Sequence, residues 1–126
     1  RDVEAAAKTA ARPPAAAVAG YYAAADVSEL MAALETLNGA LTFPAFAERA
    51  AARLGVPLRP VESGVEGATP ALRPGESAAL AVGDIGADKT ARVHLTYDPG
   101  AVSDGAAAEL LRAMKRFLEE PLTMLV

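Results

Sequence analysis

The chain has 126 residues, which predicts one domain with a single modest core. With 52% hydrophobic residues, 22% charged residues and a net charge of -4, the composition is that of a globular protein and argues against binding nucleic acid through bulk charge. The chain has no cysteine and one histidine, which excludes disulfides and thiol nucleophiles and disfavours a zinc site, and no apolar run approaches the ~20 residues of a membrane span.

Residues 1–17 combine an alanine-rich stretch with Pro13 and Pro14, a composition typical of a semi-rigid extended linker. A short capping helix ended by the prolines is the alternative for this segment. We therefore expect the folded domain over residues 18–126. Because the chain begins at Arg1 without a methionine, we interpret it as a fragment or a processed form.

The segment VAGYYAAA, residues 18–25, predicts a strand that carries Tyr21 and Tyr22 to opposite faces. The following stretch, DVSELMAALETLNG, predicts a helix, because Asp26 and Glu29 have the spacing of a capping box. The expected apolar stripe and stop signal of this helix are Leu30, Leu34, Leu37 and the pair Asn38-Gly39.

A second helix is predicted in LTFPAFAERAAARLG after a very short connection. Thr42 is expected to cap it, Pro44 is tolerated in its first turn, and Gly55 ends it. The stretch 56–75 is rich in proline and glycine, which predicts irregular structure apart from a short strand within residues 56–61.

Two further strands are predicted in SAALAVGDI and TARVHLTYD, joined by the turn GADK. The second strand is expected to have one buried and one polar face, because apolar and polar residues alternate along it: Val93, Leu95 and Tyr97 with Arg92, His94 and Thr96. The last helix begins at Ser103 or Asp104, has one apolar face and stops before Pro121.

Three polar residues in this last strand, the turn after it and the start of the helix are candidates for chemistry. His94 is the only imidazole, so it is either a general base, if oriented against a substrate, or a partly exposed structural residue. Asp98 and Asp104 bracket a turn and either form an acid/base pair or have local roles. In the local interpretation Asp98 bonds turn amides and Asp104 favours the positive end of the last helix.

The chain ends in an apolar tail, PLTMLV. Its four apolar side chains either fold back on the core or dock on another subunit; they are Leu122, Met124, Leu125 and Val126.

The C-terminal half, from ESAALAVGDI through ARVHLTYD to SDGAAAELLRAMKRFLEEPLTMLV, resembles the catalytic domain of dihydrolipoamide acyltransferases, the core subunits of 2-oxo acid dehydrogenase complexes. The N-terminal half is similar to the first strand and helix pair of that domain. The resemblance implies an α+β fold of the abridged chloramphenicol acetyltransferase type, with a small mixed sheet packed against about three helices and a trimeric state. The family's long central section is replaced here by residues 58–75.

The active-site motif of this family is Asp-His, three residues, then Asp-Gly, and its histidine deprotonates the thiol of coenzyme A or dihydrolipoamide. Asp98, Asp104 and Gly105 match the motif with one extra residue between them, but Pro99 stands in the place of the histidine. Without a base, a thiol of pKa ~8.5 stays mostly protonated, and the ~10²- to 10⁴-fold contribution of proton transfer is missing. We therefore expect a pseudoenzyme with no catalytic residue, cofactor or metal, in which the retained motif residues build the corner.

The shortened core without a histidine is most similar to the fungal proteins that bind dihydrolipoamide dehydrogenase in the pyruvate dehydrogenase complex. This resemblance implies homotrimers, docking to the acyltransferase core, and capture of dihydrolipoamide dehydrogenase through upstream domains, with the tail as an interface. A fungal protein of this kind is expected in the mitochondrial matrix and a bacterial one in the cytoplasm. The alternatives are an active acyltransferase that uses His94 or a neighbouring subunit's base, and a free-standing bacterial assembly domain.

Overall fold

The computed structural model describes residues 18–125, so the linker predicted for residues 1–17 and the last residue, Val126, lie outside the described residues. The short strand predicted within residues 56–61 is confirmed as β2. In chain order the elements are β1 (Ala19–Asp26), α2 (Ser28–Thr36), α3 (Phe43–Leu54), β2 (Leu58–Arg59), β3 (Ala78–Val82), β4 (Thr90–Tyr97), α4 (Asp104–Glu119) and the 3₁₀ helix η1 (Pro121–Leu125).

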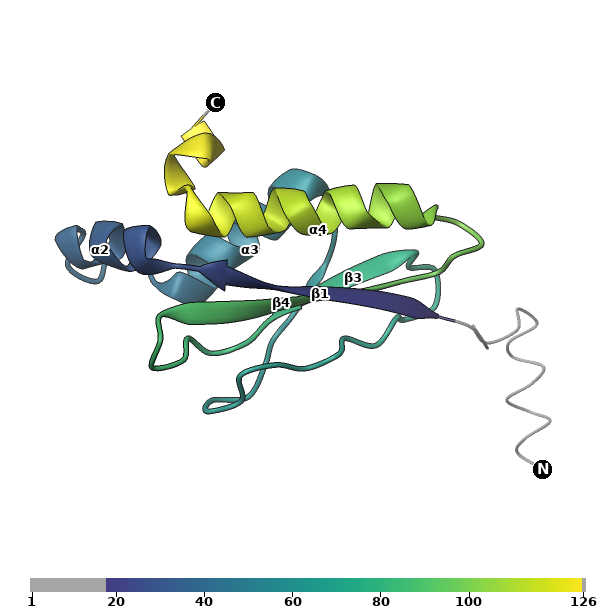
Figure 1. Cartoon of the computed structure of the whole chain (residues 1–126), viewed down its shortest axis with the longest axis horizontal. Helices are drawn as coiled ribbons and strands as arrows, with labels where there is room; N and C mark the ends of the chain where they lie inside the picture. The colour runs from purple at the N-terminus through teal and green to yellow at the C-terminus, as the bar shows by residue number, and fades with distance from the viewer. Residues whose placement is uncertain (1–17, 126) are drawn as a thin grey trace.

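The strands form one mixed sheet of four strands in the order β1-β4-β3-β2. β4 pairs antiparallel with both β1 and β3, whereas β2 runs parallel to β3. The helix α4 lies along one face of this sheet, with α3 beside it (Figure 1). The predicted fold class, a small mixed sheet packed against three helices, is confirmed. None of the helices within residues 18–125 has the length and hydrophobicity needed to cross a membrane.

The ends of α3 and α4 follow the predicted capping signals. The hydroxyl of Thr42 accepts a hydrogen bond from Ala45 N at 3.3 Å, and Gly55 ends α3 in the left-handed conformation with φ 73°. The hydroxyl of Ser103 caps α4 by accepting a hydrogen bond from Ala106 N at 3.1 Å. The apolar faces of both helices meet the sheet in one core, whose largest fully buried side chains are Tyr97, Leu30, Leu80, Leu95, Met114, Leu118, Val27 and Val93.

The start of α2 differs from the prediction, because the capping box does not form. The N-cap is Val27, without a side-chain hydrogen bond, and Asp26 is the last residue of β1. The carboxylate of Asp26 accepts hydrogen bonds from the backbone N and the hydroxyl of Ser28 at 3.0 and 2.6 Å. The predicted stripe is also shorter than expected, since Leu30 is buried while Leu37 is 46% exposed.

Residues 60–75, which we call the strap, connect β2 to β3 across the sheet face opposite the helices (Figure 1). On that face Ala79 and Ala81 are buried although they point away from the helical core. The strap lies tightly against the sheet, because a Cβ atom on Gly83 would come within 2.3 Å of the backbone oxygen of Glu66. The sheet therefore has one face covered by helices and a second face that the strap covers in part.

Candidate functional site

The corner between β4 and α4 holds the residues singled out by the sequence. Asp98 follows the end of β4, and its side-chain Oδ1 accepts a hydrogen bond from Gly100 N at 2.9 Å. Its backbone oxygen accepts hydrogen bonds from the amides of Ala101 and Val102, both at 2.9 Å. The local role predicted for Asp98, bonding of turn amides, is confirmed, and Pro99 lies exposed in the turn that these bonds close.

Asp104 ties the strand to the helix. It lies in the first turn of α4, and its Oδ1 accepts a hydrogen bond from the hydroxyl of Tyr97 at 2.5 Å. Tyr97 is 1% exposed, and its ring lies 5.5 Å from that of Tyr21. The hydrogen bond to the Asp104 carboxylate raises the pKa of the Tyr97 hydroxyl, because it stabilises the protonated phenol. Asp104 therefore has a structural partner as well as the expected position at the positive end of the helix dipole.

The glycine of the motif has no such role, contrary to our expectation that it builds the corner. A Cβ atom on Gly105 would meet no other atom within 4 Å, and its φ angle lies outside the left-handed region. An alanine would therefore fit at this position. The geometry of this chain gives no steric reason for a glycine there.

His94 lies on the sheet face opposite the helices, so it does not join the corner. Its ring stacks on the ring of Tyr22, with centroids 5.2 Å apart and planes inclined by 17°. The strap residue Gly67 also lies against the ring, since a Cβ atom there would come within 3.0 Å of His94 Cε1. Its Nδ1 is buried and has no hydrogen-bond partner. Burial, followed by the positive charge of Arg92, lowers the pKa of His94, which favours the neutral imidazole.

A second orphaned polar atom lies on the same face and was not singled out by the sequence. The hydroxyl Oγ1 of Thr96, two residues after His94, is buried without a hydrogen-bond partner. The alternation along β4 placed both residues on the polar face, but it did not predict that their polar atoms would be buried. The structure brings these two residues together and keeps them apart from Asp104.

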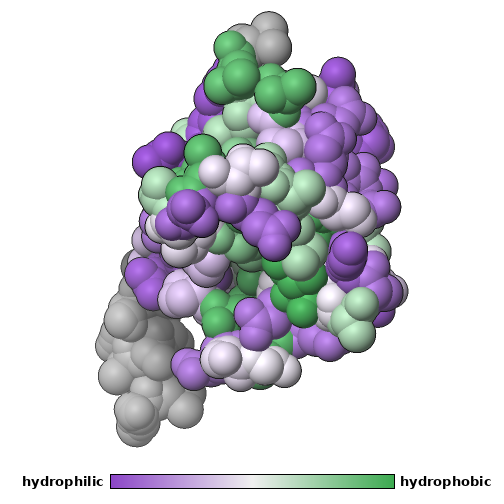
Figure 2. All heavy atoms as spheres, turned by 90° about the vertical axis from the view of Figure 1, so that its left-hand side faces the viewer, coloured by the Kyte–Doolittle hydropathy of each residue, from purple (hydrophilic) through white to green (hydrophobic). Residues whose placement is uncertain are grey.

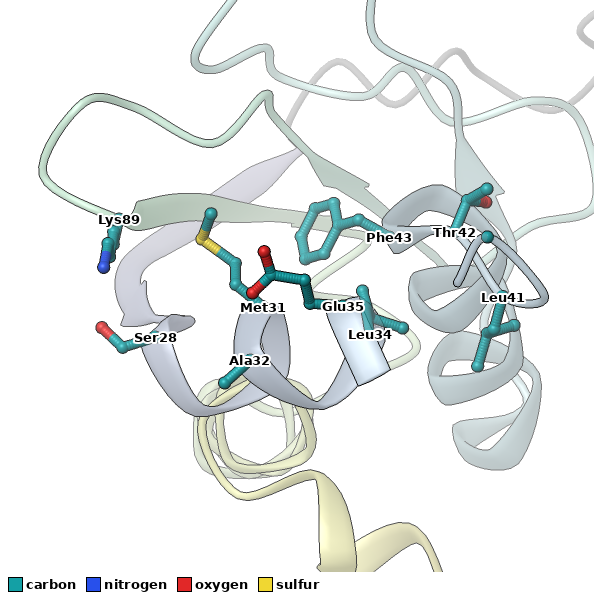
Figure 3. A pocket seen from close by; sticks show the side chains of 10 residues that line it. Ser28, Met31, Ala32, Leu34, Glu35, Leu41, Thr42, Phe43 and Lys89 are labelled. Atoms are coloured by element: carbon teal, nitrogen blue, oxygen red, sulfur yellow. The ribbon is translucent and has the colours of Figure 1, made fainter. Parts of the chain in front are cut away.

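One pocket has a volume of about 570 Å³ and lies away from the corner, over α2 and its connection to α3 (Figure 3). Met31, Glu35 and Phe43 point into its middle, and Ser28 and Lys89 lie at one end. Ser28 donates its hydroxyl hydrogen to Asp26 and has no imidazole beside it, so the pocket holds no nucleophile and base pair. No group of three or more histidine, aspartate or glutamate residues within residues 18–125 is placed to hold a metal ion.

The apolar tail folds back on the core in part only, and docking of its exposed residues on another subunit stays a prediction. Met124 packs partly against the core, and its backbone oxygen accepts a hydrogen bond from Arg53 at 2.5 Å. Leu122 and Leu125 are 68% and 81% exposed. Figure 2 shows hydrophobic side chains at the projecting tip formed by the C-terminal end. The tail is thus anchored by Met124 and leaves the side chains of Leu122 and Leu125 exposed.

The sequence matches no protein-family model and no curated protein. Solved structures do match it. One is the cubic core of the pyruvate dehydrogenase multienzyme complex, with a TM-score of 0.69 and 14% identity over 86% of this chain and 84% of that chain. Another is the dihydrolipoamide acetyltransferase of Azotobacter vinelandii, with a TM-score of 0.67 and 14% identity over 99% of this chain and 90% of that chain.

The chain has the acyltransferase core fold. This fold spans nearly all of the chain, including the N-terminal strand and helices. At 14% identity the likeness establishes the arrangement of the elements and leaves the chemistry to the residues of this chain. In this acyltransferase core fold the corner after β4 carries Pro99, and the single histidine lies on the other face of the sheet.

Proposed function

We propose that this chain is a non-catalytic structural component of the core of a 2-oxo acid dehydrogenase complex, of the type called protein X in the pyruvate dehydrogenase complex. The observation that carries the proposal is an acyltransferase core fold whose β4–α4 corner holds Pro99 where the family's motif has its base. Through domains upstream of the linker predicted for residues 1–17, the protein would anchor dihydrolipoamide dehydrogenase to the acyltransferase core.

The chemistry of the corner supports a structural role. Thiol-dependent acyl transfer needs a base within hydrogen-bond reach of the thiol, and proline has no ionisable group. The two aspartates are already engaged, Asp98 with turn amides and Asp104 with Tyr97. A corner with these contacts positions α4 on the sheet and requires no substrate.

The main rival is an active acyltransferase that uses His94. Against it, His94 stacks on Tyr22 under the strap, on the sheet face opposite Tyr97. A base that reaches the corner would then have to come from another subunit. Activity that survives replacement of His94 would identify that arrangement.

Assembly through the tail is the second part of the proposal. Leu122 and Leu125 are exposed at the tip of η1, and exposed leucines anchored by a packed neighbour are suited to fill apolar pockets on another subunit. We propose that the chain forms homotrimers and that the tail contacts the acyltransferase core, in line with the family's mode of assembly.

The test is co-elution of the chain with the cognate acyltransferase core, measured by light scattering after size-exclusion chromatography. We expect the double variant Leu122→Asp, Leu125→Asp to keep its far-ultraviolet circular dichroism and to lose co-elution. Leu37→Asp is the matched control, because Leu37 is 46% exposed but lies at the end of α2, and this variant should still co-elute. A wild-type chain that ignores the core, or a control that fails equally, would overturn the proposal.

A further inference from the structure

The strand β1 is an open edge of the sheet. It lies at one end of the strand order, and within residues 18–125 no strand flanks its outer side. The hydrogen bonds at its end establish which residues point outward: Val27 N donates to Lys89 O on the β4 side, whereas Asp26 N donates to Glu119 Oε2 on the outer side. Because these directions alternate along an antiparallel strand, the backbone groups of Gly20, Tyr22 and Ala24 point outward. This row of outward-pointing N–H and C=O groups is the one with which a further strand would pair.

The side chains along this edge do not protect it. From Ala19 to Ala25 the strand has no charged residue and no proline, which are the usual means of blocking an edge. Tyr21 and Tyr22 are 37% and 67% exposed on its two faces, and Val18 just before it is 48% exposed. Only the last residue, Asp26, has its outward amide occupied, by the Glu119 carboxylate. An unpaired backbone with apolar residues on both sides is an interaction surface.

We propose that this edge pairs with the β1 strand of a second copy of the chain, antiparallel and across a two-fold axis at Tyr22. In that register Gly20 of each copy faces Ala24 of the other, and the two Tyr22 residues face each other. Each of these three pairs exchanges two backbone hydrogen bonds, about six in all. The two sheets become one continuous sheet.

The edge itself favours a second copy over an unrelated peptide. Its outward sequence is symmetric about Tyr22, with one small residue two positions away on each side, so self-pairing brings small side chains together without a clash. Because the strand has no charge from Ala19 to Ala25, it has no means of selecting a charged peptide. Two copies of the strand also do not repel each other. The pairing is also closed, because it covers the β1 edge of both copies. Only β2, a strand of two residues, then remains at each end of the joint sheet.

This surface is separate from the corner and from the exposed tail, so the inference goes beyond the proposed function and stands without it. The tail can be blocked by Leu122→Asp, Leu125→Asp, and the edge can be tested in that background. Loss of co-elution with the acyltransferase core in the blocked chain then concerns the proposed function alone.

The experiment is oxidative cross-linking of a single introduced cysteine in the full chain with the blocked tail. The chain has no cysteine of its own, so Tyr22→Cys gives one thiol per copy. In the proposed register the two Cα atoms lie ~5.5 Å apart, within the range that a disulfide spans. We expect a cross-linked species of twice the 12.8 kDa of the chain. Leu37→Cys, whose exposed side chain directly follows α2, should form no cross-linked species under the same conditions.

A second variant keeps the inference testable if replacing Tyr22 disturbs the fold. Ala24→Lys places a charge on the edge without touching the core, because Ala24 is exposed. By light scattering at high concentration the tail-blocked chain should have about twice the mass of its Ala24→Lys variant, and the two should have the same circular dichroism. A tail-blocked chain whose mass equals that of its Ala24→Lys variant at every concentration, or equal cross-linking of Tyr22→Cys and Leu37→Cys, would overturn the inference.

Discussion

At the scale of single residues, the hydrogen bond between Tyr97 and Asp104 is the contact that closes the corner. Replacing Tyr97 by phenylalanine keeps the ring in the core and removes only the hydroxyl that reaches Asp104 Oδ1. Because Asp104 is exposed and regains water, we expect a loss of about 1.5 kcal/mol in the free energy of unfolding, the lower end for a hydrogen bond to a charged group. Urea unfolding measures this loss.

The control for this prediction is Tyr22→Phe, since Tyr22 is 67% exposed and its hydroxyl is not needed for its stacking on His94. We expect that variant to unfold at the same urea concentration as the wild type. Equal stability of Tyr97→Phe and the wild type would show that the corner does not depend on the bond.

His94 gives the chain a pH dependence of stability. Its pKa is lowered in the folded protein by burial and by Arg92, so the unfolded chain takes up a proton first as the pH falls below about 6.5. The charged groups on its face are Arg92 on β4 and Glu66 of the strap, which lie 3.8 Å apart. The free energy of unfolding should therefore decrease between pH 7 and pH 5.

The variant His94→Gln removes this titration and should give a flatter profile over the same pH range. Urea midpoints measured at several pH values provide the comparison, because carboxylates common to both proteins contribute equally. If both profiles fall in parallel, His94 does not couple stability to pH.

At the scale of elements, the first turn of α4 tolerates a side chain that the family's motif does not have. We expect Gly105→Ala to raise the free energy of unfolding by up to ~0.5–1 kcal/mol, because Gly105 has a helical φ and open space around it. Gly55→Ala is the matched control and should destabilise the chain, since Gly55 ends α3 with φ 73°. Thermal unfolding of both variants measures the contrast.

A stabilised Gly105→Ala variant that still assembles would show that the glycine is dispensable. A variant that loses assembly while its monomer stays folded would instead place Gly105 in a contact with another chain. Lower stability of the isolated chain would contradict the account of the corner.

The elements that the sequence predicted well are those with local signals. Thr42 and Gly55 bound α3 as expected, and the alternation of Val93, Leu95 and Tyr97 gave the buried face of β4. The start of α2 was wrong because pairing of β1 with β4 extends through Asp26, a tertiary effect that outweighs the capping-box spacing. Local spacing does not report on strand pairing between residues far apart in the chain.

At the scale of the whole molecule, the sequence predicted the fold class, and its motif located the corner. It could not predict that the strap would cover His94, because the path of residues 60–75 depends on contacts such as that between Glu66 and Gly83. The sequence also did not predict the pocket over α2, because its walls come from three separate segments. These features arise only when distant parts of the chain are brought together.

The measurement that most directly tests a non-catalytic role is acyl transfer between acetyl coenzyme A and dihydrolipoamide, with an active acyltransferase core as the positive control. We expect no turnover above the uncatalysed rate, because Pro99 provides no base and His94 faces the other side of the sheet. Turnover by the purified chain that His94→Ala abolishes would contradict the account and show that His94 is the base.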